Sequence, residues 1–358
     1  MNPSTPVVRV ENMPALPSTS KSALVALVLL VLATTLAWGE EPIPVNVSNF
    51  NRAETDLYCS KRVKAGGFGK ILHEREMAPI DKQEVVRLNR DTLYSTGVFD
   101  LEAGPVTVTL PDTGKRYMSI LAVSEDAYSP AVVYAPGHYT LTKETVGTRY
   151  VYIFIRTLAN PQDPTDMKAA HAAQDAIKVE QARAGKWEAP NWDPASQDKV
   201  RDALKLLASL GGAGNGIAFG TKEQVDPVLH LIGTAVGWGG NPPAAAVYNL
   251  VYAKQNDGKT VYSLTAKDVP VDGFWSISVY NAEGYFVKND LDAYSLNNLT
   301  AKPNPDGSFT LQFGGCQKDT LNCLPIMPGW NYIVRMYRPR KAILDGTWKF
   351  PEAKVASQ

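Results

Sequence analysis

The chain has 358 residues, of which 44% are hydrophobic, and its 36 basic residues balance its 36 acidic residues. This composition excludes an intrinsically disordered chain, and the lack of a basic surplus argues against a nucleic-acid-binding protein. Three cysteines cannot form a small disulfide scaffold or a four-cysteine metal site, and the length favours two folded domains.

The N-terminus has the pattern of a secretory signal peptide. Lys21 precedes an uncharged apolar run from Ala23 to Trp38. Residues 1–39 are therefore predicted to be an export signal, with Met13 as an alternative start that would give a signal of ordinary length. The run is shorter than the roughly 20 apolar residues of a spanning helix, which favours a cleaved, periplasmic chain over an inner-membrane anchor at residues 22–39.

An exported chain meets an oxidising compartment, which affects how its cysteines are interpreted. Cys316 and Cys323 lie close together in the sequence, so we expect them to form a disulfide that closes a short loop. The alternative, a metal site built on this pair, lacks a second pair of ligands nearby. Cys59 is then left over and is predicted to be a buried, inert thiol.

Residues 40–160 are predicted to form an N-terminal β-rich module. Residues 49–80 have a mixed and partly helical pattern, and strand signals dominate after them. The β-branched and aromatic runs bounded by Gly and Pro are typical of a sheet with at least one buried face. These runs predict strands at 106–110, 116–121, 139–141 and 149–156.

Residues 161–240 differ in composition and are predicted to be a helical segment and linker. The stretch 166–183 is rich in Ala and charged residues and has no Gly or Pro, and the stretch 195–210 has apolar residues at helical spacing. A third helix is predicted to begin at Thr221, because Gln224 completes a capping box. The glycines before it lack the Lys and Ser or Thr of a phosphate-binding loop.

Residues 241–358 are predicted to form a C-terminal β-sandwich module. Asn256-Asp257-Gly258 predicts a hairpin between strands at 247–253 and 260–266. Further strands are predicted at 274–280, 308–313 and 332–337. Many short strands with regular turns favour an α+β fold that is mainly β, with two β-sandwich or jelly-roll-like modules and a helical segment.

Two polar segments are candidates for a functional site. The first segment is 87–95, and its functional interpretation makes Arg90 a clamp for an anion and Asp91 an acid or base. A structural interpretation, which the residues alone favour, makes them a salt-bridged pair. The second segment, 289–298, is either an ordinary turn-rich loop or a binding loop, with Tyr294 for stacking and Asn297 for hydrogen bonding.

Other patterns that would indicate a reaction are missing from the sequence. Neither a nucleophile-elbow motif nor a zinc-protease motif occurs, and the four His residues are scattered singly, so no metal and no cofactor is predicted. Four aromatic residues form either a carbohydrate platform or, as their alternation favours, part of a sandwich core. They are Trp275, Tyr280, Trp330 and Trp348.

Several motifs together resemble a bacterial family that pairs domain of unknown function 1254 with domain of unknown function 1214. The motifs are Asn89–Ser95 (NRDTLYS), Pro111–Gly114 (PDTG), Asp268–Ser276 (DVPVDGFWS) and Asp345–Trp348 (DGTW). The resemblance implies two β-rich modules with a helical segment between or against them, and it implies no reaction. Many relatives have a His in the stretch that corresponds to residues 125–128, where this chain has Ala127 instead.

These observations predict an exported protein that binds a polar envelope metabolite or glycan in a cleft between the modules. If the chain is an enzyme, it is expected to be a hydrolase; the alternative is a non-catalytic structural or interaction protein of the envelope. No nucleic acid is expected to bind, and a membrane only through an uncleaved N-terminal segment. The candidate catalytic residues are Arg90 and Asp91, and the candidate binding residues are Asn89, Tyr94, Tyr294, Asn297 and Arg335.

Overall fold

The fold is mainly β with a minority of helix. The computed structural model describes residues 41–83, 85–211 and 217–356, so the predicted signal peptide lies outside the described residues. In this described part, sixteen strands form four sheets, which confirms the α+β prediction. None of the described helices is long and apolar enough to cross a membrane.

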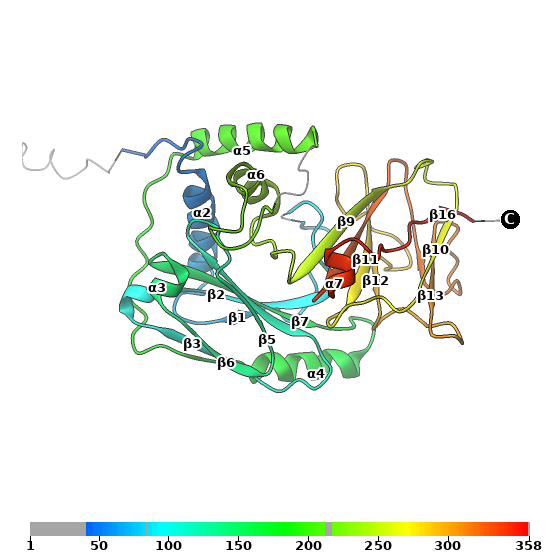
Figure 1. The fold of residues 1–358 in the computed structure, drawn as a ribbon, viewed down its shortest axis with the longest axis horizontal. Helices are drawn as coiled ribbons and strands as arrows, with labels where there is room; N and C mark the ends of the chain where they lie inside the picture. The colour runs from blue at the N-terminus through cyan, green and yellow to red at the C-terminus, as the bar shows by residue number, and fades with distance from the viewer. Residues whose placement is uncertain (1–40, 84, 212–216, 357–358) are drawn as a thin grey trace, which may run out of the picture. The chain divides into compact units, whose positions relative to one another are not determined.

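The N-terminal module is a sandwich of two sheets (Figure 1). Its core lies between them and is built from alternate strand residues such as Val108 and Ile120. The larger sheet contains, in order, β1 (Leu72–His73), β2 (Thr92–Asp100), β7 (Tyr150–Leu158), β4 (Met118–Ser124) and β5 (Ala131–Tyr134). The smaller sheet contains β6 (Gly137–Leu141), β3 (Val106–Leu110) and β8 (Lys178–Glu180), and short helical turns lie at η1 (Leu101–Ala103) and α3 (Lys143–Val146).

Four longer helices pack against this module. They are α2 (Phe50–Lys64), α4 (Pro164–Asp175), α5 (Pro194–Ser209) and α6 (Pro227–Gly237). The last three each begin with Pro and are capped by an Asp side chain, which satisfies N–H groups that have no partner within the helix. Residues of α2 and α5, including Phe50 and Leu204, share a small core to which α6 also contributes. Figure 1 shows α2, α5 and α6 on one side of the module and α4 on the other.

The first predicted helix is shorter than expected. α4 ends at Asp175 rather than Arg183, and β8 follows it. β8 pairs with β3, and Val179 packs against the core of the module. The composition favours helix throughout this stretch, but strand pairing and burial of Val179 outweigh the propensity.

The third predicted helix begins later than expected. Gln224 Oε1 accepts a hydrogen bond from the Thr221 backbone N–H at 3.0 Å, which is half of a capping box. The chain nevertheless continues in turns, and α6 starts only at Pro227. Asp226 accepts hydrogen bonds from two N–H groups there, and we attribute the later start to this stronger cap.

The C-terminal module is a second sandwich (Figure 1). One sheet contains β14 (Cys323–Leu324), β13 (Phe309–Phe313), β10 (Tyr262–Ala266) and β16 (Lys354–Val355). The other contains β12 (Ser295–Asn297), β11 (Trp275–Tyr280), β15 (Asn331–Tyr337) and β9 (Ala246–Tyr252), and α7 (Lys341–Leu344) follows β15. Trp275 and Trp330 are buried between the sheets and Trp348 packs against them, as predicted for a core. Tyr280 lies on the opposite face of β11 and belongs to another cluster.

The predicted hairpin between β9 and β10 does not form. β9 pairs with β15, whereas β10 pairs with β13 and β16, so the two strands lie in different sheets. The turn itself is present, because the Asp257 side chain accepts hydrogen bonds from the N–H groups of Lys259 and Thr260. The turn therefore links the two layers of the sandwich instead of pairing its flanking strands.

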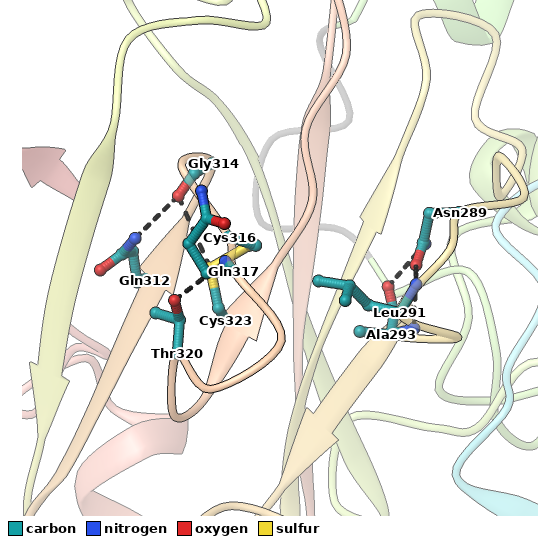
Figure 2. The surroundings of a disulfide bond; sticks show 9 residues. All are labelled: Asn289, Leu291, Ala293, Gln312, Gly314, Cys316, Gln317, Thr320 and Cys323. Carbon is teal, nitrogen blue, oxygen red and sulfur yellow. Dashed lines mark hydrogen bonds between the residues drawn. A yellow bond between two sulfur atoms is a disulfide. The ribbon is translucent and has the colours of Figure 1, made fainter.

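The predicted disulfide between Cys316 and Cys323 is present, and Cys59 is free and buried. The bond closes the loop between β13 and β14 (Figure 2). Within this loop, the Gln317 N–H donates a hydrogen bond to Thr320 Oγ1 at 2.9 Å. The loop thus has an internal hydrogen bond as well as the covalent link.

Candidate functional site

The two modules contact each other along the polar face of the β12-β11-β15-β9 sheet, and we call this contact the seam. Side chains alternate across a strand, so one set on β11 and β15 enters the sandwich core and the other set faces the N-terminal module. The second set includes Ser276, which pairs across the sheet with Arg335 and with Asn297. All three are buried. Buried polar groups need partners, and Arg335 and Asn297 each find one in the N-terminal module, whereas the Ser276 hydroxyl has none.

Asp91 joins the two modules from the N-terminal side of the seam. It is 1% exposed, and its Oδ1 accepts hydrogen bonds from Ser295 Oγ at 2.8 Å and from Asn297 Nδ2 at 3.2 Å. Both donors belong to β12 of the C-terminal module. The other carboxylate oxygen, Oδ2, is buried and has no hydrogen-bond partner.

Arg335 is the central cation of the C-terminal side. Its Nη1 donates to Ser278 Oγ at 2.9 Å, and its Nη2 donates to Tyr280 OH at 2.7 Å and to the Arg87 carbonyl at 2.8 Å. Burial disfavours the charged form, but the nearby hydroxyls of Tyr280 and Tyr337 and the carboxylate of Asp91 raise the pKa of Arg335 above its ordinary value. Arg335 therefore stays charged inside the seam.

Arg90 lies apart from its sequence neighbour Asp91. Its guanidinium is 5.2 Å from the ring centroid of Tyr294 and donates to the Ala78 carbonyl. In the described part of the chain no salt bridge joins Arg90 to Asp91. Burial lowers the pKa of Arg90 from its ordinary value. The two adjacent residues consequently have separate surroundings.

A second polar group lies in the same seam and is centred on Arg156. Tyr94, Arg156, Ser119 and Tyr134 are successive cross-strand partners on β2, β7, β4 and β5, so they form one row on one face of the sheet. Arg156 is only 6% exposed. Its guanidinium lies 5.5 Å from the ring centroid of Tyr94.

Arg156 has weak acceptors and no carboxylate partner. Its Nη2 donates to the Gly239 carbonyl at 3.1 Å, and its Nη1 lies 3.5 Å from Asn241 Oδ1, the upper limit for a hydrogen bond. No Asp or Glu of the described chain forms a salt bridge with Arg156. Burial opposes its charge, but the surrounding tyrosine hydroxyls, Tyr94 and Tyr248 first among them, raise the pKa of Arg156 above its ordinary value.

Another arginine without a carboxylate partner, Arg338, lies beside Arg156 at Tyr134. The guanidinium of Arg338 is 4.5 Å from the ring centroid of Tyr134, and among the described residues no Asp or Glu pairs with it. The positive charges of Arg338 and Arg156 both act on the Tyr134 hydroxyl. Two uncompensated cations therefore converge on one tyrosine.

The rest of the Arg156 group is mainly aromatic, and some of its hydroxyls have no hydrogen-bond partner. The buried hydroxyls of Tyr117 and Ser119 have no hydrogen-bond partner. The Tyr117 ring packs against Phe274 and Tyr337 of the C-terminal module, at centroid distances of 5.1 Å and 5.5 Å. Burial raises the pKa of Tyr117. Gly273 leaves room for this ring, since a Cβ there would lie 3.1 Å from Tyr117 Cδ2 and 2.7 Å from the Tyr337 carbonyl oxygen.

Asn89 connects the Asp91 group with the Arg156 group. Its Nδ2 donates to Tyr94 OH at 3.1 Å, and its Oδ1 accepts from the Asp91 N–H at 3.0 Å. The structure thus brings Asn89, Asp91, Tyr94, Asn297 and Arg335 together at the seam, with Arg90 and Tyr294 paired nearby. Arg156 was missed in the sequence analysis, although a charge in the otherwise apolar run of β7 is a recognisable signal.

Two cavities lie away from these residues, in the N-terminal module. One of about 210 Å³ is lined mainly by apolar side chains of β3, β4, β5 and β6. The other, of about 480 Å³, is lined by charged residues that include Asp100, Arg149 and Lys186. Neither cavity includes Arg90, Asp91 or Arg156 among its lining residues.

A buried acidic pair lies at the N-terminal module's helical side. Asp56 Oδ2 accepts a hydrogen bond from Trp192 Nε1 at 2.8 Å, and its buried Oδ1 has no partner. Burial, together with the negative charge of Glu125, raises the pKa of Asp56 to about 7. Glu125 begins the stretch 125–128, and His230 of α6 stacks on Tyr128 of that stretch at a ring-centroid distance of 4.4 Å.

Family models match both modules. Residues 68–181 match the model described as protein of unknown function (DUF1254), and residues 251–341 match protein of unknown function (DUF1214). No curated protein matches the sequence.

Two solved structures are similar in fold. The VPA0106 protein from Vibrio parahaemolyticus is 20% identical, with a TM-score of 0.64 over 86% of this chain and 98% of its own. A putative uncharacterized protein from Burkholderia cenocepacia is 15% identical, with a TM-score of 0.51 over 87% of each chain. At these identities the likeness concerns the fold alone.

Proposed function

This chain belongs to the family that pairs a DUF1254 module with a DUF1214 module, and we propose that it binds a small anionic molecule at the seam between them. The bound group is a carboxylate or a similar anion. It lies against Arg156 and Arg338 and accepts hydrogen bonds from the tyrosine hydroxyls around them. This proposal narrows the polar ligand expected from the sequence to an anionic one.

The observation that supports this proposal is the burial of Arg156 without a carboxylate partner. In an unliganded protein, a buried charge that lacks a counter-ion lowers the stability by on the order of several kcal/mol. Proteins that retain such a cost commonly use the charge to bind a ligand. Arginine also suits the task, since its planar donors match the two oxygens of a carboxylate.

We place this binding function in the periplasm. The signal-like N-terminal sequence and the disulfide between Cys316 and Cys323 both support export, because such bonds persist in oxidising compartments. N-terminal sequencing of the mature protein tests this location. A chain that retains Met1 would contradict cleavage of the signal.

Hydrolysis of the bound anion is the second candidate function. The observation that favours it is the buried, unpartnered Oδ2 of Asp91, which is able to accept a proton from a water molecule. If Asp91 is catalytic, Asp91→Asn abolishes turnover of anionic esters or glycosides and leaves the melting temperature nearly unchanged. If turnover persists, or if the wild-type protein turns over none of these substrates, Asp91 serves only to join the modules.

Calorimetric titration with succinate, citrate, galacturonate and inorganic phosphate tests anion binding. We expect at least one of these anions to bind, and Arg156→Gln and Arg338→Gln each to weaken it by about tenfold or more, which corresponds to one charge-assisted hydrogen bond. Arg340→Gln is the matched control, because Arg340 is exposed and already pairs with Asp272. If no anion binds, or if Arg156→Gln binds as well as wild type, the proposal is wrong.

A further inference from the structure

We infer that the anion site continues along β9 as a binding strip for an acidic oligosaccharide, an inference that rests on the proposed function. The strip consists of Tyr248, Leu250 and Tyr252, and we call it the β9 strip. These alternate residues lie on one face of an edge strand and are 41%, 43% and 56% exposed. Large apolar side chains gathered in this way on one exposed face are typical of a binding surface.

One end of the β9 strip is part of the anion site. Tyr248 is the cross-strand partner of Arg335 and therefore lies on the seam face of the sheet. Its hydroxyl accepts a hydrogen bond from Asn241 Nδ2 at 2.9 Å, and Asn241 Oδ1 faces Arg156. A ligand bound at Arg156 thus has Tyr248 beside it.

The other end of the β9 strip carries another arginine without a carboxylate partner. Arg87 Nη2 donates to Tyr252 OH at 3.1 Å, and among the described residues no Asp or Glu pairs with Arg87. Its buried Nε has no hydrogen-bond partner at all. Positive charges therefore flank both ends of the strip, which extends over roughly 13 Å at the usual rise of a strand.

This arrangement fits a chain of acidic sugars better than other ligands. A sugar ring offers an apolar C–H face to a tyrosine ring and hydroxyls to its phenol group. Carboxylates repeated along the sugar chain would meet the arginines at the two ends. An uncharged glycan would leave those arginines unpaired, and an acidic peptide would use the backbone edge of β9 instead of its face.

Calorimetric titration with tetragalacturonate, galacturonate and uncharged cellotetraose tests the inference. We expect tetragalacturonate to bind about tenfold more tightly than galacturonate, and cellotetraose to bind weakly or not at all. Tyr252→Ala should remove this tenfold advantage and leave galacturonate binding unchanged, whereas Tyr252→Phe, which retains the ring, should keep most of it. Leu344→Ala on α7 is a control of similar exposure outside the strip.

The possible results separate this inference from the proposed function. If anions bind but tetragalacturonate binds no more tightly than galacturonate, the strip is not an oligosaccharide site and the anion site stands. If tetraglutamate binds as tightly as tetragalacturonate, the ligand is not a saccharide. If none of the anions in the earlier panel binds, the proposed function itself fails. Should Tyr252→Ala not fold, Arg87→Gln gives the same test, since only the Arg87 carbonyl contacts Arg335.

Discussion

Ser295 donates a hydrogen bond of 2.8 Å to Asp91 across a sequence separation of 204 residues. Asn297 donates to the same carboxylate oxygen, so one buried atom of the N-terminal module receives two hydrogen bonds from β12. Charged acceptors form stronger hydrogen bonds than neutral ones, and here they connect two modules that have separate cores.

Removal of this acceptor should destabilise the whole chain. Asp91→Ala removes the acceptor of the buried Asn297 amide and of the half-buried Ser295 hydroxyl, and we expect the free energy of unfolding to fall by about 2–4 kcal/mol. Urea denaturation at neutral pH measures the change. Asp290→Ala, at an exposed position of the neighbouring loop, should change the stability little, and an equal loss in both variants would contradict the role of Asp91.

A second prediction concerns the buried pair that joins α2 to α5. Glu54 is buried and accepts hydrogen bonds from Arg201 and Gln197. Because Glu54→Ala leaves the largely buried Arg201 without this partner, we expect a loss of about 3–5 kcal/mol in the free energy of unfolding. Asp198 contacts the same arginine from an exposed position, so Asp198→Ala should cost less than about 1 kcal/mol. Equal costs for the two variants would show that burial does not decide the effect.

The stability of the protein should also depend on Asp56 in a specific pH range. Its folded pKa of about 7 is above the ordinary value of 3.8, so the folded state holds this proton more tightly than the unfolded chain does. The contribution of Asp56 to stability is therefore complete below about pH 4 and is lost as the pH rises to about 7. Asp56→Asn should raise the melting temperature relative to wild type at about pH 8 but not at about pH 4. The exposed Asp202→Asn should show no such pH-dependent difference.

Reduction of the disulfide should lower stability without unfolding the protein. Opening the short Cys316–Cys323 loop removes about 2–3 kcal/mol in the loop-entropy model. Alkylation without reductant should label one thiol, Cys59, and only after denaturation, because that residue is buried. Labelling of three thiols without reductant would show that the bond does not form in the protein.

Local sequence patterns predicted many of the strands but missed others, β2 among them, and they did not predict the partners of the strands. The strand at Trp275–Tyr280 and the disulfide were both expected, since alternation and close spacing are local features. The hairpin of β9 and β10 was wrong because pairing depends on which sheet buries each strand, and β9 finds β15 instead.

The candidate site could be predicted only in part, because its residues are brought together by strand pairing. Asp91 and Asn297 were both selected from the sequence, but as members of two separate segments. Only the pairing of β12 with β11 brings Asn297 within reach of Asp91. Arg156 and Arg338 are not among the site residues predicted from the sequence, because only their packing reveals that they lack a counter-ion.

The polar row of Tyr94, Arg156, Ser119 and Tyr134 also affects how the protein can fold. Each module would expose its seam face if it were made alone, and Tyr117 would lose its packing against Phe274 and Tyr337. Contacts between residues so far apart in sequence form late, because the intervening chain must be ordered first. We therefore expect the proposed anion site to form only late in folding, when the two sandwiches close on each other.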